Sequence, residues 1–165
     1  MLALLGHILG VSTGEYELYA ERAVGMERPD GTDDQRRGIS QSRRGVYVLK
    51  QQLGFENKLY FFETAEDVVR EIEEGTVAPF LIISEINLPK TSGLQLKQYL
   101  LKHQSTNFKS IPFVFLTQTP SRVQIEQAYH LCTNGLFKKP DSFNKLKQLL
   151  IDIVNYWRES IVPLN

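Results

Sequence analysis

The stretch from Phe80 to Gly93 constrains the fold of this chain more than any other. It opens with an apolar run without alternation that ends at Ile83, then carries Glu85, and reaches Gly93 through a turn that contains Pro89. An uninterrupted apolar run is typical of a strand buried on both faces, and such strands belong to parallel sheets covered by helices. In open α/β sheets, functional residues lie just beyond the carboxyl ends of the strands. Glu85 is therefore the first candidate for a functional residue.

Strand and helix patterns alternate along the chain from Ile39 onward. The predicted strands are Lys58–Phe62, Phe80–Ile83, Ile111–Leu116 and Leu136–Phe137. Three predicted helices are Ile39–Leu53, which ends before Gly54, Leu94–Leu101 and Phe143–Trp157. A fourth is capped by Thr64 and ends at Gly75. A fifth is capped by Thr119, has Pro120 in its first position and ends at Asn134-Gly135. Repeated βα units with short connections predict an α/β fold with a doubly wound parallel sheet.

Composition excludes several classes of protein. The 165 residues are enough for one compact domain and an extension, and Lys+Arg and Asp+Glu are balanced at 19 each, so no nucleic-acid surface is expected. The single cysteine, Cys132, excludes an internal disulfide and a cysteine-based metal cluster. No apolar run reaches the roughly 18 residues of a membrane span. We therefore expect a cytoplasmic protein.

Polar residues end three of the predicted strands. Glu85, Thr117 and Lys139 each follow an apolar run, and the carboxyl ends of parallel strands meet at one edge of a sheet. A hydroxyl and an ammonium at that edge suit a phosphoryl group, because one donates to a phosphate oxygen and the other neutralises charge. We expect Lys139 to form a salt bridge with Glu85, and Lys138 to point away from the site by strand alternation.

These motifs resemble those of a known family. They are Leu53-Gly54-Phe55, Glu85-Ile86-Asn87-Leu88-Pro89 with Gly93, Leu116-Thr117 and Lys139-Pro140. In this order and at these intervals, the chain from about Ile39 to Trp157 resembles the receiver domain of two-component response regulators of the chemotaxis-regulator type. The resemblance implies a flavodoxin-like, five-stranded sheet in the order 2-1-3-4-5. It also implies that Glu85 stands where the family has its phosphoacceptor aspartate, that Thr117 and Lys139 are the phosphate-site residues, and that the backbone carbonyl of Asn87 falls at the Mg²⁺ site.

The first departure from the family is Glu85, whose side chain is one methylene longer than aspartate. Phosphoryl transfer depends mostly on positioning, and a misplacement of about 1 Å can cost on the order of 100-fold in rate. We therefore expect a degenerate phosphorylation site. Glutamate also resembles a phosphorylated aspartate, because its charge lies further out, toward Thr117 and Lys139.

The second departure concerns the metal. The family has two adjacent acids after its first strand, which by the spacing from Leu53-Gly54-Phe55 should lie near Arg37 and Gly38, and neither is acidic. Asp33 and Asp34 lie too early, follow no apolar strand, and are interpreted as part of a solvated loop. No cofactor is expected, and Mg²⁺ is expected only if the N-terminal segment completes the acidic pair.

The central strand of the expected sheet has no obvious source. The chain divides into an atypical N-terminal segment, residues 1–37, and a receiver-like domain, residues 38–160. Met1–Val11 is the best candidate for the first strand by apolarity, although it requires an unusually long connection. The alternative is that residues 1–37 are not a true receiver start.

The leading functional interpretation is a receiver-like signalling module in a phosphorelay, a pseudo-receiver that is not an enzyme and is not phosphorylated conventionally. Its expected partner is a sensor histidine kinase or another signalling protein. A homodimer could form through the face made by the helix Pro120–Leu131, the strand after it and the helix Asp141–Trp157. Two alternatives stay open. One is a Mg²⁺-dependent phosphoacceptor receiver, and the other is a flavin-binding protein that uses Ser12-Thr13-Gly14 as its phosphate loop. No nucleic acid and no membrane is expected as a partner.

Overall fold

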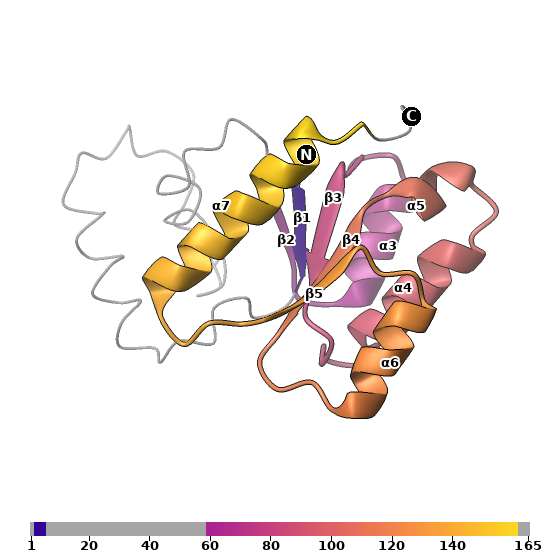
Figure 1. Ribbon diagram of the computed structural model, residues 1–165. Helices are drawn as coiled ribbons and strands as arrows, with labels where there is room; N and C mark the ends of the chain where they lie inside the picture. The colour runs from indigo at the N-terminus through magenta and orange to yellow at the C-terminus, as the bar shows by residue number, and fades with distance from the viewer. Residues whose placement is uncertain (1, 6–58, 162–165) are drawn as a thin grey trace, which may run out of the picture. The chain divides into compact units, whose positions relative to one another are not determined.

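A five-stranded parallel sheet organises the part of the chain that the structure, a computed structural model, describes, namely residues 2–5 and 59–161 (Figure 1). Its strands are β1 (Leu2–Leu5), β2 (Leu59–Phe62), β3 (Leu81–Ser84), β4 (Phe113–Thr117) and β5 (Gly135–Lys138). The helices are α3 (Ala65–Glu73), α4 (Gly93–Lys102), α5 (Thr106–Ser110), α6 (Arg122–His130) and α7 (Phe143–Glu159). The helix predicted over Ile39–Leu53 lies outside the described residues.

The strands lie in the order β2-β1-β3-β4-β5, and every neighbouring pair is parallel. This is the order that the resemblance implies. The central strand is β1, which pairs with β2 and β3 in one register, so that Leu2 lies opposite both Leu59 and Leu81. Carboxyl ends of all five strands therefore lie at one edge of the sheet.

The central strand falls within the apolar segment Met1–Val11. It belongs to the same compact unit as residues 57–165. The long connection from β1 to β2 lies outside the described residues, so the predicted boundary between residues 37 and 38 stays a prediction.

The two faces of the sheet are buried under helices. On one face, Ile82, Phe113 and Phe115 form a core with residues of α3, α4 and α6. By strand alternation, Leu81, Ile83, Val114 and Leu116 point to the opposite face, where α7 lies (Figure 1). α7 buries four apolar residues at helical spacing: Leu146, Leu150, Ile153 and Val154.

The start of α3 follows the prediction, whereas the predicted start of α6 is wrong. Thr64 caps α3, since its hydroxyl oxygen accepts from the N–H of Asp67. α6 is capped by Ser121, not by Thr119. The Ser121 hydroxyl accepts from the Gln124 N–H, and the Gln124 side chain accepts from the Ser121 N–H, which completes a capping box. This reciprocal pair satisfies two backbone donors, so the helix begins after Pro120 rather than at it.

The predicted end of α6 is wrong as well. The helix ends at His130, before the predicted end at Asn134-Gly135, and Cys132 just after it takes the left-handed conformation (φ 53°). The Asn134 side chain instead accepts from the N–H of Phe113, 2.8 Å away, and Gly135 begins β5. The short helix α5 was not predicted, because five residues are too few to show a helical period.

Candidate functional site at the carboxyl edge of the sheet

Glu85 is held at the end of β3 by its own backbone contacts. The buried Ser84 hydroxyl donates to the Glu85 carbonyl (2.9 Å), and the Gly93 N–H donates to the Ile86 carbonyl (2.9 Å). A Cβ added to Gly93 would lie 2.2 Å from the Glu85 carbonyl oxygen and 2.8 Å from Ser84 Oγ. Only glycine permits so close an approach, so the start of α4 fixes the loop that carries Glu85.

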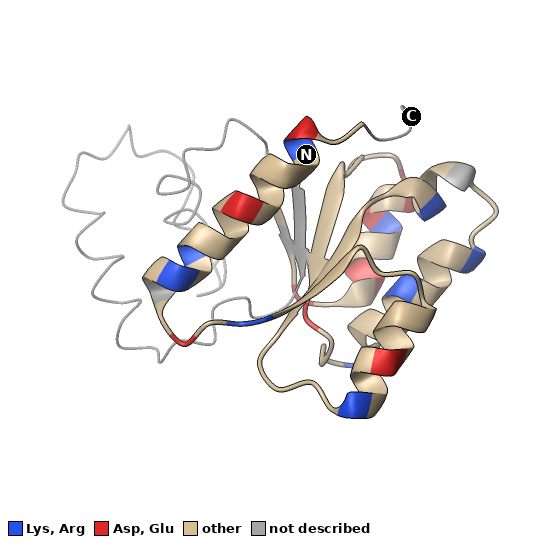
Figure 2. Cartoon of the chain, viewed as in Figure 1, with Lys and Arg blue, Asp and Glu red and all other residues tan. Residues whose placement is uncertain are grey.

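Lys139 reaches Glu85 from the far side of β4. It follows β5, where its N–H donates to the carbonyl of Thr117 at 2.7 Å. Its Nζ lies 3.4 Å from Glu85 Oε2, and the two side chains are only 5% and 12% exposed, respectively. Figure 2 shows the end of β5 coloured as basic. The predicted salt bridge is therefore present, and Lys138 is exposed, as alternation predicted.

Burial and the neighbouring carboxylate act on Lys139 in opposite directions. Burial lowers the pKa of its ammonium, while the charge of Glu85 and the hydrogen bond to it raise that pKa, and the result lies below the ordinary value. Lys97 on α4 is also buried, and its Nζ lies 5.4 Å from the centre of the Phe113 ring. Its pKa is lowered by burial as well.

Both oxygens of the Glu85 carboxylate accept hydrogen bonds within the site. Oε1 accepts from the N–H of Ile86 (2.8 Å) and of Asn87 (3.3 Å), while Oε2 faces the Lys139 ammonium. The side chain thus folds back over its own loop. These contacts hold the carboxylate at both oxygens, between its own loop and the end of β5.

Thr117 lies at this edge but does not join the pair. The residue is buried at the end of β4, yet no hydrogen bond joins its hydroxyl to the Glu85 carboxylate among the described residues. Of the three residues predicted to converge, the structure therefore links Glu85 and Lys139 directly. Thr117 is linked to Lys139 through the backbone.

A contact that we did not predict joins this loop to α6. The side-chain oxygen of Asn87 accepts from Gln124 Nε2 at 2.9 Å, and the same Gln124 side chain caps α6 through Ser121. The spacing Ser121-x-x-Gln124 is a capping-box signal, so the sequence could have placed Gln124 at the start of α6. The pairing with Asn87 required the fold.

The segment that would hold the family's acidic metal ligands, after β1, lies outside the described residues. The residues that directly follow β1 in sequence are Gly6, His7 and Ile8, none of them an acid. In residues 2–5 and 59–161, no group of three or more His, Cys, Asp or Glu side chains is placed to hold a metal ion. Asp33 and Asp34, and the flavin-loop candidate Ser12-Thr13-Gly14, lie outside the described residues.

Comparison with known proteins agrees with this architecture. No model of a protein family matches the chain. Over 111 residues it is 29% identical to the "Probable methanogenesis regulatory protein FilR2" of Methanothrix harundinacea, covering 65% of this chain and 70% of that protein. Over 88 residues it is 27% identical to the response regulator Rcp1 of Synechocystis, covering 53% of this chain and 58% of that protein.

Solved structures show the same fold. The Mn²⁺-bound form of Rcp1 matches with a TM-score of 0.61 at 17% identity, and RPA3017, a response regulator in red light signalling of R. palustris, with 0.65 at 13%. Each match covers 99% of both chains. The chain therefore has the fold of a response-regulator receiver domain, as the sequence motifs indicated. In the described ranges, no helix has both the length and the apolarity needed to cross a bilayer.

Proposed function

We propose that this chain is a signalling module of a two-component system whose receiver site works without conventional phosphorylation. The observation that carries the proposal is the Glu85 carboxylate, which is engaged at Oε1 by two backbone N–H groups and at Oε2 by Lys139. An acceptor oxygen must be free to lie in line with the donor phosphorus. An acid whose two oxygens are already held cannot attack without breaking these contacts.

The lack of carboxylates directly after β1 in the sequence also supports the proposal that the site is not phosphorylated conventionally. A receiver needs carboxylates beside its acceptor to bring the metal and the phosphoryl group together. Gly6, His7 and Ile8, which directly follow β1 in sequence, supply none, and Asn87 offers at most a carbonyl oxygen. The module is accordingly proposed to bind partners and not to act as an enzyme.

The proposed partner is a sensor histidine kinase or another signalling protein of the cytoplasm, and the proposed contact face is made by α6, β5 and α7. Each of these elements exposes a large side chain with apolar surface: Tyr129 on α6, Phe137 on β5 and Tyr156 on α7. Exposed aromatic residues are favoured at protein interfaces. The relatives fit this role, since one is named a regulatory protein and the other a response regulator. A homodimer through the same face is the second form of this proposal.

Incubation with Mg²⁺ and acetyl phosphate, followed by intact-protein mass spectrometry, tests the proposal. We expect no phosphoryl adduct on the native chain under conditions in which a conventional aspartate receiver is modified in full. A stoichiometric adduct on Glu85 would overturn the proposal and establish the alternative, a Mg²⁺-dependent phosphoacceptor.

A second arm uses Glu85→Asp, which separates the two departures from the family. If the shortened acid is also unmodified, the missing metal ligands block the reaction. If it accepts phosphate, the length of the acid alone is responsible, and the proposed lack of metal ligands is wrong.

A further inference from the structure

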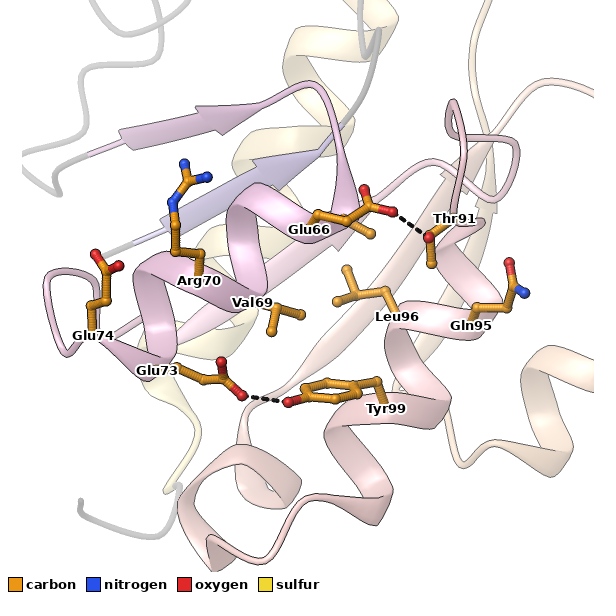
Figure 3. A pocket seen from close by; sticks show the side chains of 10 residues that line it. Glu66, Val69, Arg70, Glu73, Glu74, Thr91, Gln95, Leu96 and Tyr99 are labelled. Carbon is orange, nitrogen blue, oxygen red and sulfur yellow. Dashed lines mark hydrogen bonds between the residues drawn. The ribbon is translucent and has the colours of Figure 1, made fainter.

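A groove of about 530 Å³ lies between α3 and α4, and neither Glu85 nor Lys139 lines it (Figure 3). Val69 from α3 and Leu96 from α4 face each other across it, so its floor is apolar. Both helices are about ten residues long, which corresponds to roughly 15 Å of groove. This length matches about three turns of a docked helix.

The walls of the groove are tied together at both ends. Figure 3 shows Thr91 donating to Glu66 at one end and the Tyr99 hydroxyl donating to Glu73 at the other. These bonds fix the spacing of α3 and α4. The bond to Glu73 also holds the Tyr99 ring in place, while 40% of the residue stays exposed. A ligand could therefore contact this ring without a loss of side-chain entropy at Tyr99.

The rim of the groove is acidic. Three glutamates line it, namely Glu66, Glu73 and Glu74. The lining also includes Arg70, but its guanidinium is engaged by Asp67 at 2.9 Å and by Glu71 at 3.7 Å. The cation on this rim is therefore compensated by acids of the same helix.

Two further groups reduce the negative charge of this rim. The hydrogen bond from Thr91 lowers the pKa of the Glu66 carboxyl, and the nearby charge of Lys90 lowers it to a smaller extent. His103 Nε2 lies 3.5 Å from Glu73 Oε1. The side chain of Glu74, like that of Glu73, is exposed on the rim, so the Glu73–Glu74 end of the groove carries two neighbouring exposed acids.

We propose that this groove docks an amphipathic helical segment of a partner protein, with arginines on either side of a short apolar stripe. The apolar stripe would lie over the half-buried Val69, with Leu96 buried beneath it, as helices do when they bind in grooves. The arginines would face the glutamates, and one would stack on the exposed ring of Tyr99. The acidic rim repels nucleic acid and anionic lipid, which leaves a cationic protein segment as the complementary ligand.

Fluorescence anisotropy with a labelled peptide tests this assignment on the full chain. The probe is a helical peptide of about fifteen residues with leucines at i, i+4 and i+7 and arginines flanking them. We expect saturable binding that weakens with added salt. In the double variant Glu73→Gln/Glu74→Gln, which keeps an acceptor for the Tyr99 hydroxyl, binding should weaken about three- to tenfold.

The matched control neutralises two exposed acids elsewhere, Glu126→Gln on α6 and Asp152→Asn on α7, and should leave binding unchanged. Equal weakening in the control, or equal binding by a scrambled peptide of the same composition, would show general charge attraction and overturn the assignment. Absence of binding at low salt would overturn it as well.

Sedimentation velocity distinguishes another occupant. If the native chain is a dimer that Glu73→Gln/Glu74→Gln dissociates, a second copy fills the groove and the cationic-partner assignment is wrong. None of these outcomes depends on acetyl phosphate, so they separate this inference from the proposed function.

Discussion

Lys139 keeps its charge in a buried position because Glu85 lies beside it. The ammonium is 5% exposed, and the carboxylate oxygen 3.4 Å away opposes the effect of burial on its pKa. A lysine whose pKa in the folded state lies below its unfolded value binds protons less well when folded. Its protonation therefore disfavours the folded state below the folded pKa, and this penalty disappears as the pH rises toward the unfolded pKa.

The variant Glu85→Gln should lower the pKa of Lys139 further, because burial then acts without the opposing charge. Titration of the Lys139 side chain by NMR measures this, and Lys97, whose pKa burial lowers independently of Glu85, is the internal control. We also expect the variant to unfold more easily at neutral pH, by about 1–3 kcal/mol. This difference should shrink as the pH is raised toward about 10. An unchanged Lys139 pKa would show that the carboxylate does not support the charge.

The close contacts around Gly93 leave no room for a side chain at the start of α4. We expect Gly93→Ala to reduce the free energy of unfolding by about 1–3 kcal/mol, because the new Cβ meets the Glu85 carbonyl and Ser84. It should also shift the amide resonance of Ile86. The control is Gly75→Ala, which has a left-handed φ of 72° but open space around it. That variant should lose stability without disturbing Ile86, so equal shifts in both variants would contradict the steric account.

At the scale of elements, the capping box of α6 makes a contact with the loop that carries Glu85, and the capping box of α4 makes no such contact among the described residues. Both helices begin with a capping box, Ser92 with Gln95 and Ser121 with Gln124. Only Gln124 additionally donates to Asn87, 37 positions earlier in the chain. A change in the conformation of the Glu85 loop would therefore alter the Asn87–Gln124 hydrogen bond and the start of α6, which is part of the proposed contact face.

A comparison of the two boxes isolates this link. Gln95→Ala should cost only the capping contribution of about 1 kcal/mol, whereas Gln124→Ala should cost that amount plus about 0.5–1.5 kcal/mol for the bond to Asn87. A double-mutant cycle with Asn87→Ala, followed by chemical denaturation, measures the coupling directly. Hydrogen exchange should also quicken in the first turn of α6. Additive effects in the cycle would exclude the link.

The elements that the sequence predicted well are those whose signals are local. Uninterrupted apolar runs predicted β3 and β4 because both faces of these strands are buried, and Thr64 marked α3 because its cap lies within one turn. The contact of Lys139 with Glu85 followed from the rule that parallel strands end at a common edge. The start of α6 was mistaken because two hydroxyl residues flank Pro120, and the choice of Ser121 depends on the reciprocal bond with Gln124.

At the scale of the whole molecule, the central strand could not be located from local sequence alone. β1 is only four residues long, and its place follows from pairing with two strands that come much later in the chain. Apolarity made Met1–Val11 a candidate, but the register with β2 and β3 is a property of the assembled sheet.

Proline at the centre of β1 tests this dependence. Ala3 lies opposite Tyr60 on one side and Ile82 on the other, and proline cannot donate to either ladder. We expect Ala3→Pro to abolish cooperative unfolding in urea followed by far-UV circular dichroism. Ala78→Pro, in the exposed connection before β3, is the control and should unfold cooperatively. A cooperative transition in both variants would contradict a structural role for β1.

The position of β1 has a consequence for synthesis. Ribosomes make this strand before either of its neighbours, so the nascent chain carries an apolar segment that waits unpaired until β2 and β3 emerge. Sheets closed by such distant partners form slowly and are exposed to aggregation meanwhile. Production of this protein in cells should therefore benefit from chaperones that shield β1 until β2 and β3 have been made.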